Sequence, residues 1–305
     1  MLLVGCRQDL SQSPGRRPTA QTLPDEFSIM TYNLRHYSLE DRDGDGLPSE
    51  PKPLTEREAV VDLVARWRPD ILAVQEIGSE VFQEFRRLLR TRVLEYPWSE
   101  LLVRPGSRIG LAVLTRFPIT HRQPRLDQTY RIGTNELYVL RGFLDVEIQI
   151  REDYRLRLVV AHLKSKVFHP MGQTEMRRNE ARLLHAVVSE LLNARSNLNL
   201  LVVGDLNDTP DSAPIRRLTS EGEPRLYDLR PADEWGDVWT YFHRASDTYS
   251  RIDYALASAG ILPEFVRERS RAVRDPGVYR ASDHRPLFLV FKARELAPSG
   301  GNPPR

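Results

Sequence analysis

Apolar and β-branched residues recur along the chain in short runs, and most of these runs end at once in a polar residue. FSIMTYNL at residues 27–34 predicts a strand that ends at Asn33. DILAVQEI at residues 70–77 predicts a second, buried strand that ends at Glu76. The same pattern predicts further strands in IGLAVLTR (109–116), LYVLRGFLDVEIQI (137–150), LRLVVAHLKS (156–165), LNLLVVGDLND (198–208), RIDYALAS (251–258) and HRPLFLVFKA (284–293).

Three segments between these runs have the spacing of amphipathic helices instead. TEREAVVDLVARW (55–67) begins with Thr55 as its predicted N-cap, carries a glutamate three residues later, and is stopped by Pro69. SEVFQEFRRLLRTR (79–92) and TEMRRNEARLLHAVVSELLNA (174–194) predict the other two helices. Because several strands follow one another without a helix between them, we expect sheets packed on each other with helices outside.

Length and composition fit one large domain, predicted over residues 27–293, because no linker interrupts the pattern there. Of the 305 residues, 40% are hydrophobic and 28% are charged, as in an ordinary globular protein. A formal net charge of +2 is too small to indicate nucleic-acid binding by itself. The single cysteine excludes an internal disulfide, and no apolar run approaches the length of a membrane-spanning helix.

The N-terminal residues leave two interpretations open. LVGC at residues 3–6 resembles the lipobox of bacterial lipoproteins, whose cysteine is lipidated, but only five residues precede Cys6. A lipidated Cys6 would tether the protein to a membrane and place it in the bacterial cell envelope or outside the cell; a chance match would leave it in the cytoplasm. Residues 1–26 are predicted to form a flexible tether or a disordered terminus, and residues 294–305 a disordered tail.

Polar side chains gather where the predicted strands begin or end. An apolar run next to Asp, Glu, Asn or His is where an α/β fold exposes functional groups. Any one of these residues could be a turn former or a satisfied buried polar group, but so many at such positions indicate a site. They are Asn33, Glu76, His162, Asp205, Asn207, Asp253, Asp283 and His284.

The residue types in this set point to a hard cation. Carboxylate and amide oxygens suit Mg²⁺ or Mn²⁺. The set contains no thiolate, and its two histidines lack the His-x-x-x-His spacing of a helical zinc site. A hard cation combined with histidines favours hydrolysis of a phosphate ester, in which the metal neutralises charge and a histidine activates water.

Six segments in a fixed order carry a family resemblance: MTYNLR, DILAVQE, VVAHLKS, VVGDLND, RIDYAL and SDHRPL. Together they resemble the endonuclease/exonuclease/phosphatase superfamily with the DNase I-like fold, over roughly Phe27 to Lys292. The resemblance implies an α/β (α+β) four-layer sandwich, with two packed mixed β-sheets flanked by helices and a site in a cleft at one end. It implies a divalent-metal-dependent phosphodiesterase, foremost an endonuclease-like nuclease on DNA or RNA. A phosphatase, a sphingomyelinase-like lipid phosphodiesterase and a catalytically silent binding domain are the alternatives.

The resemblance also implies a role for each residue. Glu76 would be the principal ligand of Mg²⁺ or Mn²⁺, with Asn33 and Asp283 nearby. Asp205 would position the attacking water or bind a second metal, and Asn207 would lie beside it across the phosphate.

The histidines and two basic residues would act on the phosphate. His284 would be the general base or a phosphate contact, oriented by Asp253. His162 would donate to the phosphate or protonate the leaving group. Arg141 and Lys164 are weaker phosphate candidates, since a surface arginine and a solvated loop lysine explain them as well. Lys166, Arg177 and Arg178 are further basic residues that could contact a polyanion, and the protein is expected to be a monomer.

An acidic loop, DRDGDG at residues 41–46, is set apart from this group. Asp41, Asp43 and Asp45 have the spacing that begins a calcium loop, but Lys52 stands where an EF-hand requires glutamate. The loop is expected on the rim of the cleft, either as a structural Ca²⁺ site or insert that shapes access, or as an Asp/Gly-rich turn. In neither case is it predicted to be the catalytic metal site.

Overall fold

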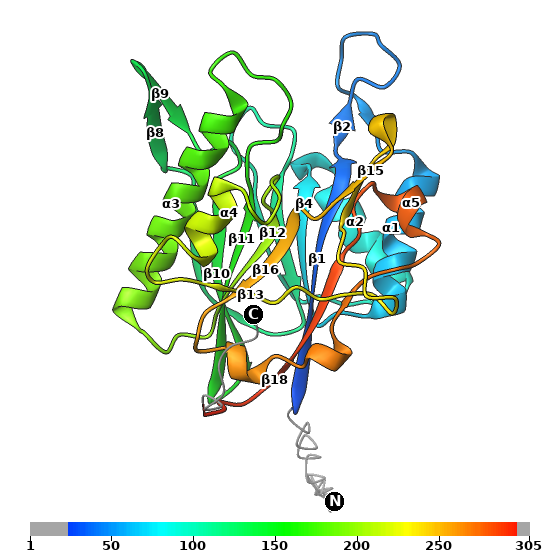
Figure 1. Cartoon of the computed structure of the whole chain (residues 1–305). Helices are drawn as coiled ribbons and strands as arrows, with labels where there is room; N and C mark the ends of the chain where they lie inside the picture. The colour runs from blue at the N-terminus through cyan, green and yellow to red at the C-terminus, as the bar shows by residue number, and fades with distance from the viewer. Residues whose placement is uncertain (1–23, 298–305) are drawn as a thin grey trace, which may run out of the picture.

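Two six-stranded mixed sheets pack against each other at the centre of the molecule (Figure 1). The structure is a computed structural model and describes residues 24–297. In the first sheet the strand order is β17-β18-β1-β4-β6-β5, with β1 (Glu26–Tyr37), β4 (Ile71–Ile77), β5 (Trp98–Leu102), β6 (Gly110–Thr115), β17 (Arg271–Ala272) and β18 (Leu287–Lys292). In the second it is β13-β16-β12-β11-β10-β7, with β7 (Ile119–Arg125), β10 (Phe143–Arg151), β11 (Tyr154–His162), β12 (Leu200–Asp205), β13 (Tyr227–Asp228) and β16 (Asp253–Ala257).

Both sheets share one arrangement of strand directions. In the first sheet the central pair β1 and β4 is parallel, and their outer neighbours β18 and β6 run antiparallel to them. In the second sheet β11 and β12 form the parallel pair, flanked by antiparallel β10 and β16. The carboxyl ends of the parallel strands therefore lie at one edge of each sheet, where β16 and β18 begin.

Helices cover the outer face of each sheet (Figure 1). α1 (Leu54–Trp67), α2 (Ser79–Thr91) and α5 (Val278–Ala281) lie against the first sheet, and α3 (Gln173–Ala194) and α4 (Ala213–Thr219) against the second. Single-turn 3₁₀ helices occur at η1 (Arg244–Ser246), η2 (Leu262–Glu264) and η3 (Arg267–Arg269). The predicted four-layer α/β sandwich is confirmed.

The layers explain why the central strands are continuously apolar. Along β1, Phe27 and Ile29 point into the core between the sheets, whereas Met30 and Tyr32 point into the core under α1 and α2. Side chains alternate across a strand, so a strand that is covered on both faces needs apolar residues at successive positions. Burial on both faces holds the strand ends, and hence the residues that follow them, in fixed positions.

The first predicted helix differs from the structure at its start. α1 begins at Leu54, and Pro53 occupies the position before it, so the predicted Thr55 N-cap is wrong. The carbonyl of Pro53 accepts the N–H groups of Glu56 (2.9 Å) and Arg57 (3.0 Å), so the helix starts two residues earlier than an N-cap at Thr55 would place it. The helix ends at Trp67, before Pro69, as predicted.

The predicted strand over residues 137–150 is two separate strands. β9 (Asn135–Tyr138) pairs with β8 (Thr129–Ile132) in a small hairpin, and β10 begins only at Phe143. Gly142 separates them with a φ of +67°, and a Cβ at this position would lie 2.7 Å from the carbonyl oxygen of Arg125. Two further small hairpins, β2 (Leu39–Glu40) with β3 (Glu50–Pro51) and β14 (Tyr241–His243) with β15 (Thr248–Ser250), were not predicted either.

The predicted tether and tail fall largely outside the described residues. Cys6 and the rest of residues 1–23 lie outside them, as do residues 298–305. Residues near these limits contact the sandwich: the Asn199 amide donates to Glu295 Oε1 (2.8 Å), and Lys292 Nζ donates to Glu26 Oε1 (2.6 Å). Within residues 24–297, none of the helices combines the length and apolarity needed to cross a membrane.

A buried carboxyl group follows β16, beyond the opposite end of that strand from Asp253. Glu264, at the end of η2, is 0% exposed, accepts the hydroxyl of Tyr154 at 2.7 Å, and accepts the N–H of Leu296 at 3.2 Å. Burial raises the pKa of Glu264 to about 7, and the Tyr154 hydrogen bond opposes that change only in part. The protonated form is therefore favoured in the folded protein.

We expect Glu264→Gln to flatten the pH dependence of stability. A carboxyl whose pKa is raised by folding stabilises the protein below its ordinary pKa, and this contribution is lost as pH rises through about 7. Relative to Glu264→Gln, the free energy of unfolding of the unmodified protein should fall by about 2–3 kcal/mol between pH 4.5 and 8. Urea unfolding across this range measures it, and exposed Glu152→Gln is the control. Parallel pH curves for the unmodified protein and Glu264→Gln would contradict the assignment.

Candidate active site

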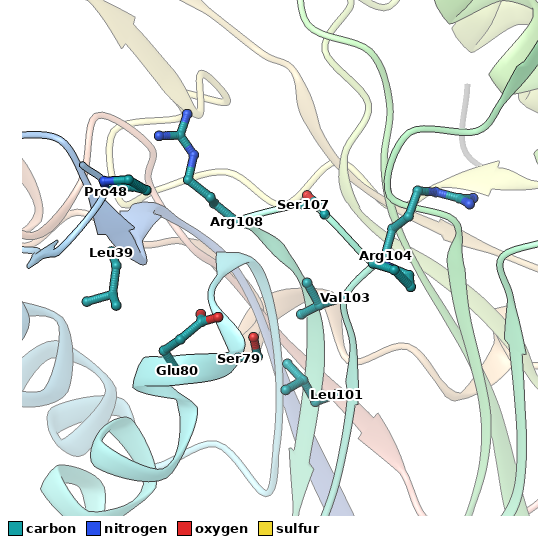
Figure 2. A pocket seen from close by; sticks show the side chains of 11 residues that line it. Leu39, Pro48, Ser79, Glu80, Leu101, Val103, Arg104, Ser107 and Arg108 are labelled. Atoms are coloured by element: carbon teal, nitrogen blue, oxygen red, sulfur yellow. The ribbon is translucent and has the colours of Figure 1, made fainter. Parts of the chain in front are cut away.

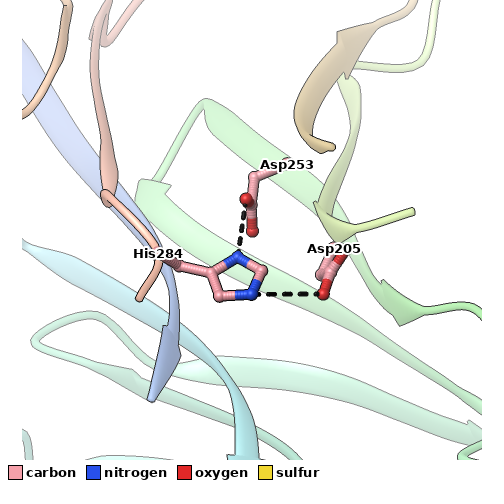
Figure 3. Close-up of side chains that lie close together, drawn as sticks. All are labelled: Asp205, Asp253 and His284. Carbon is pink, nitrogen blue, oxygen red and sulfur yellow. Dashed lines mark hydrogen bonds and ion pairs between the residues drawn. The ribbon is translucent and has the colours of Figure 1, made fainter. Parts of the chain in front are cut away.

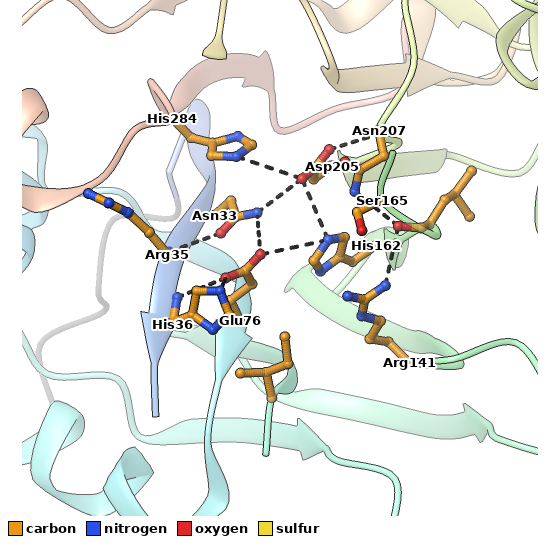
Figure 4. Close-up of polar contacts among 12 residues, drawn as sticks. Asn33, Arg35, His36, Glu76, Arg141, His162, Ser165, Asp205, Asn207 and His284 are labelled. Carbon is orange, nitrogen blue, oxygen red and sulfur yellow. Dashed lines mark hydrogen bonds and ion pairs between the residues drawn. The ribbon is translucent and has the colours of Figure 1, made fainter. Parts of the chain in front are cut away.

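The predicted residues converge at the edge where the parallel strands of both sheets end (Figure 4). Asn33 lies near the end of β1 and Glu76 near the end of β4, while His162 and Asp205 are the last residues of β11 and β12. The antiparallel neighbours complete the group at their starts: Asp253 is the first residue of β16, and Asp283 and His284 precede β18.

The side chain of Asn33 joins the two sheets. Its Nδ2 donates to Glu76 Oε1 (3.2 Å) in the first sheet and to Asp205 Oδ2 (3.0 Å) in the second. Its Oδ1 accepts the N–H of Arg35 (3.0 Å), and its backbone carbonyl accepts the hydroxyl of Ser282 (2.8 Å). Asn33 is 1% exposed, so this bridge is a fixed part of the interior.

His284 lies between two aspartates (Figure 3). Its Nδ1 hydrogen-bonds Asp253 Oδ2 at 2.8 Å, and its Nε2 lies 3.8 Å from Asp205 Oδ2. Burial alone would lower the pKa of His284, but the charge and hydrogen bond of Asp253 raise it to about 10. A protonated imidazole donates a hydrogen bond and cannot accept a proton, which suits the predicted phosphate contact; the role of general base stays a prediction.

His162 stands on the other side of Asp205. Its Nε2 lies 3.6 Å from Asp205 Oδ2 and 3.9 Å from Glu76 Oε1. Burial, together with the charge of Arg141, lowers the pKa of His162 well below its ordinary value. A neutral imidazole keeps one N–H to donate and one lone pair to accept. Its Nδ1 is buried and has no hydrogen-bond partner among the described residues, so this side chain has unused bonding capacity.

Asp205 is the central carboxylate of the group and is 2% exposed. Its Oδ1 accepts the backbone N–H of Asn207 at 2.8 Å, and Asn207 in turn donates from Nδ2 to the Leu163 carbonyl at 3.0 Å. Burial raises the pKa of Asp205 to about 7, and the nearby charge of Asp253 adds to this effect. A carboxylate with a pKa near neutrality is suited to accept a proton from water.

Glu76 is held in an unusual backbone conformation. Its φ is +63° and that of Asn207 is +56°, both in the left-handed region that costs a non-glycine residue about 1–3 kcal/mol. Burial would raise the pKa of Glu76, but the nearby imidazoles of His162 and His36 and the backbone N–H of His36 lower it below its ordinary value. Glu76 is therefore an ionised, nearly buried carboxylate.

The donor set fits a hard divalent cation. Glu76 and Asp205 offer carboxylate oxygens on either side of the Asn33 amide, and Asp283 Oδ1 lies 4.0 Å from His284 Nε2 at the same edge. The two carboxylates share the Asn33 amide as a donor and keep further oxygen lone pairs, which are the ligands that a hard cation prefers. Asp205, Asp253 and His284 also have donor atoms within 4.8 Å of one another, but the Asp253–His284 hydrogen bond already occupies two of them.

The weaker basic candidates differ in their placement. Arg141 is half-buried and points toward the group, donating to the Leu163 carbonyl at 3.4 Å (Figure 4). Lys164 instead turns its Nζ into its own loop, where it donates to the carbonyls of Ser165 (3.1 Å) and Val167 (2.9 Å). No contact places Lys164 at the site, so its predicted phosphate contact gains no support from its position.

The other basic residues mostly have structural partners. Arg177 is 3% exposed and binds Asp208 (2.8 Å) and the Lys164 carbonyl (3.1 Å), so it is not available to a polyanion. Lys166 pairs with Asp208 at 3.3 Å but keeps an exposed side chain, and Arg178 pairs with Glu175 on the surface of α3.

The acidic loop between β2 and β3 projects beyond the strand ends (Figure 1). Asp41 and Asp43 come together with Glu50, whereas Asp45 is not in this group. The carboxylates accept backbone N–H groups within the loop: Asp41 accepts those of Gly44 (2.8 Å) and Gly46 (3.1 Å), and Asp45 accepts that of Leu47 (2.7 Å). This pattern is that of an Asp/Gly-rich turn, and a calcium site of Asp41, Asp43 and Asp45 stays a prediction.

Several residues at the site were not predicted. The Ser282 hydroxyl accepts the N–H of His284 (3.1 Å) while it donates to Asn33, which couples the last strand to the first. The Tyr241 ring packs against His284 with 4.8 Å between the ring centres. Arg35 and His36 lie two and three residues after Asn33, and Arg35 Nε lies 3.6 Å from Asp283 Oδ2. Ser282, Arg35 and His36 lie close to motif residues in the sequence, and this proximity could have identified them.

A separate cavity of about 550 Å³ opens between β2, the start of α2 and the loop before β6 (Figure 2). Its lining includes Leu39, Ser79, Leu101, Val103, Arg104 and Arg108. None of the predicted site residues lines this cavity, so it is separate from the predicted site.

Comparisons with known proteins agree with this geometry. A model described as the Endonuclease/Exonuclease/phosphatase family matches residues 30–284. No curated protein sequence matches the chain. The catalytic domain of human nocturnin with bound sulfate anion is similar, with a TM-score of 0.62 and 18% identity over 88% of this chain and 95% of that chain. Truncated TDP2 from Caenorhabditis elegans has a TM-score of 0.61 and 18% identity, over 88% of this chain and 98% of that chain. Sphingomyelinase C from Streptomyces griseocarneus has a TM-score of 0.61 and 16% identity, over 88% of this chain and 99% of that chain. At these identities the likeness shows a shared fold.

We expect Asp253→Asn to lower the pKa of His284. The substitution removes the charge that holds this imidazole protonated, so the pKa should fall by about one to three pH units. Titration of the histidine ring signals by NMR measures the change. Buried His185 on α3 is an internal control whose titration should stay unchanged. Equal His284 titrations in both proteins would show that Asp253 does not set its protonation.

Proposed function

The chain belongs to the endonuclease/exonuclease/phosphatase family, and on this basis we propose that it is a divalent-metal-dependent phosphodiesterase that cleaves DNA or RNA. Family membership supports hydrolysis of a phosphoester in general. The observation that carries the proposal is the bridge from Asn33 to both Glu76 and Asp205, with His162 and His284 on either side of Asp205. These side chains place acceptors and donors around a space where a phosphate could sit.

Glu76 would hold the cation, with Asn33 and Asp283 beside it. Mg²⁺ or Mn²⁺ bound there would supply neutralisation of the negative charge that develops on the phosphate. The two strained left-handed residues, Glu76 and Asn207, flank this space, and strain of this kind is found at functional sites.

Side chains of the protein would accept the proton of the attacking water and donate hydrogen bonds to the phosphate. Asp205, fixed by the Asn207 N–H, would orient the attacking water and accept its proton as the new P–O bond forms. His284, held by Asp253, would donate to a non-bridging phosphate oxygen. The neutral His162 would donate a hydrogen bond to the oxygen that leaves as the old P–O bond breaks, and this oxygen would take its proton from water. Arg141, which points toward this group, would add charge beside the phosphate.

A lipid phosphodiesterase with the same site is the second candidate. Val167 and Phe168 are 72% and 79% exposed in the loop that follows β11, directly after His162 and Lys164. Large apolar side chains exposed beside a catalytic group suit an apolar substrate or a lipid surface. Faster cleavage of a choline phospholipid than of DNA, and loss of that preference in Phe168→Ser, would favour this candidate.

We expect metal-dependent nicking of plasmid DNA that requires Asp205 and His284. Asp205→Ala removes the proton acceptor and His284→Ala a phosphate donor, so each should lower the rate at least about 100-fold. Gel assays with Mg²⁺, Mn²⁺ or EDTA measure the rate, and circular dichroism confirms folding.

The matched controls are Asp153→Ala and His121→Ala. Asp153 lies in the turn between β10 and β11, at the opposite end of β11 from His162, and His121 is exposed on β7. Both variants should keep the activity of the unmodified protein. Cleavage that survives in Asp205→Ala, or that is insensitive to EDTA, would contradict the proposed function.

A further inference from the structure

A bulge in the first strand brings an additional histidine to the site. β1 and β4 pair in parallel from Ile29 onward, but the register jumps from Asn33 opposite Gln75 to Tyr37 opposite Ile77. Residues 34–36 therefore face the single residue Glu76. Bulges of this kind re-aim side chains next to active sites.

The bulge has an energetic cost on both strands. Arg35 and His36 each have a φ of +50°, and Glu76 opposite them has a φ of +63°. Such conformations persist in non-glycine residues only where the surrounding structure enforces them, and they concentrate at functional sites. Three residues with such conformations, Arg35, His36 and Glu76, lie opposite one another here, and this calls for a functional explanation.

Both the backbone and the ring of His36 are directed at Glu76. The backbone N–H of His36 donates to Glu76 Oε2 at 2.8 Å, and the ring Nε2 lies 3.8 Å from the same oxygen (Figure 4). Two donor atoms that each lie about 2.1 Å from one ion are about 3–4 Å apart. The His36 side chain is 53% exposed, so it borders the open part of the site rather than the core.

A carboxylate fixes the other side of this ring. His36 Nδ1 lies 3.2 Å from Glu40 Oε1, and Glu40 is itself held by the Ser38 hydroxyl (2.7 Å) and by Arg108 (3.3 Å). A carboxylate at Nδ1 keeps the proton on that nitrogen and leaves the Nε2 lone pair free. Histidines that bind metals are commonly oriented by a carboxylate in this way.

We propose that His36 is a ligand of the cation held by Glu76, with Glu40 as the residue that positions its ring. The inference rests on the proposed metal-dependent function and specifies its metal. Mg²⁺ prefers oxygen ligands, whereas an imidazole nitrogen suits transition metals. The site would therefore bind Mn²⁺, or another first-row transition ion, in preference to Mg²⁺.

Binding of Mn²⁺ to the full chain, without substrate, tests this inference. His36→Asn removes the nitrogen ligand but tolerates the left-handed backbone. We expect calorimetry to show at least a tenfold loss of Mn²⁺ affinity in His36→Asn and a smaller loss in Glu40→Gln, with Mg²⁺ affinity changed less than twofold. Pulsed EPR of bound Mn²⁺ should show ¹⁴N modulation that weakens in His36→Asn. His121→Asn, an exposed histidine of β7, should match the unmodified protein.

The outcomes separate this inference from the function on which it rests. Unchanged Mn²⁺ affinity and ¹⁴N modulation in His36→Asn would overturn the ligand assignment while leaving the metal site in place. The same result with a raised KM for DNA would overturn it in favour of a contact between His36 and the substrate. Failure of the unmodified protein to bind either ion would overturn both the inference and the proposed function.

Discussion

Two carboxylates, Glu76 on the first sheet and Asp205 on the second, are joined by the single amide of Asn33, and the rest of the site is arranged around this bridge. Both side chains are held in place, because the strands that carry them are covered on both faces. The Asn33 amide lies between them and donates to both, and a histidine stands on each side of Asp205. The Asn33 amide is a neutral donor, so a bound cation would add the charge neutralisation that this amide cannot supply.

Both sheets have the same arrangement of strand directions, and this explains why one end of the sandwich can hold so many functional groups. Each sheet contributes the carboxyl ends of a parallel pair and the start of one antiparallel neighbour. The same register that pairs His162 with Asp205 also pairs Asp205 with Asp253. Backbone pairing alone thus places three catalytic candidates side by side, before any side-chain contact is considered.

The predictions from sequence succeeded where hydrophobic pattern determines structure and failed where long-range contacts do. Central strands and their terminal polar residues were correct because burial on both faces leaves a clear apolar run. The division at Gly142 was missed, since the reason is a close approach to the Arg125 carbonyl, which no local pattern reports. Lys164 was a candidate phosphate contact because of its place in the motif, but its ammonium group donates to carbonyls of its own loop. His36 was overlooked because its importance depends on a bulge opposite Glu76, 40 residues away.

The antiparallel pairing of β1 with β18 joins nearly the first described residues to nearly the last. The ribosome must therefore have made β18 before the first sheet can close beside β1. Until then β1 has an unpaired edge, which invites association with other nascent strands. The Asp283–His284 pair arrives with the same final segment. Synthesis order thus delays completion of the site until the segment that carries Asp283, His284 and β18 has been made.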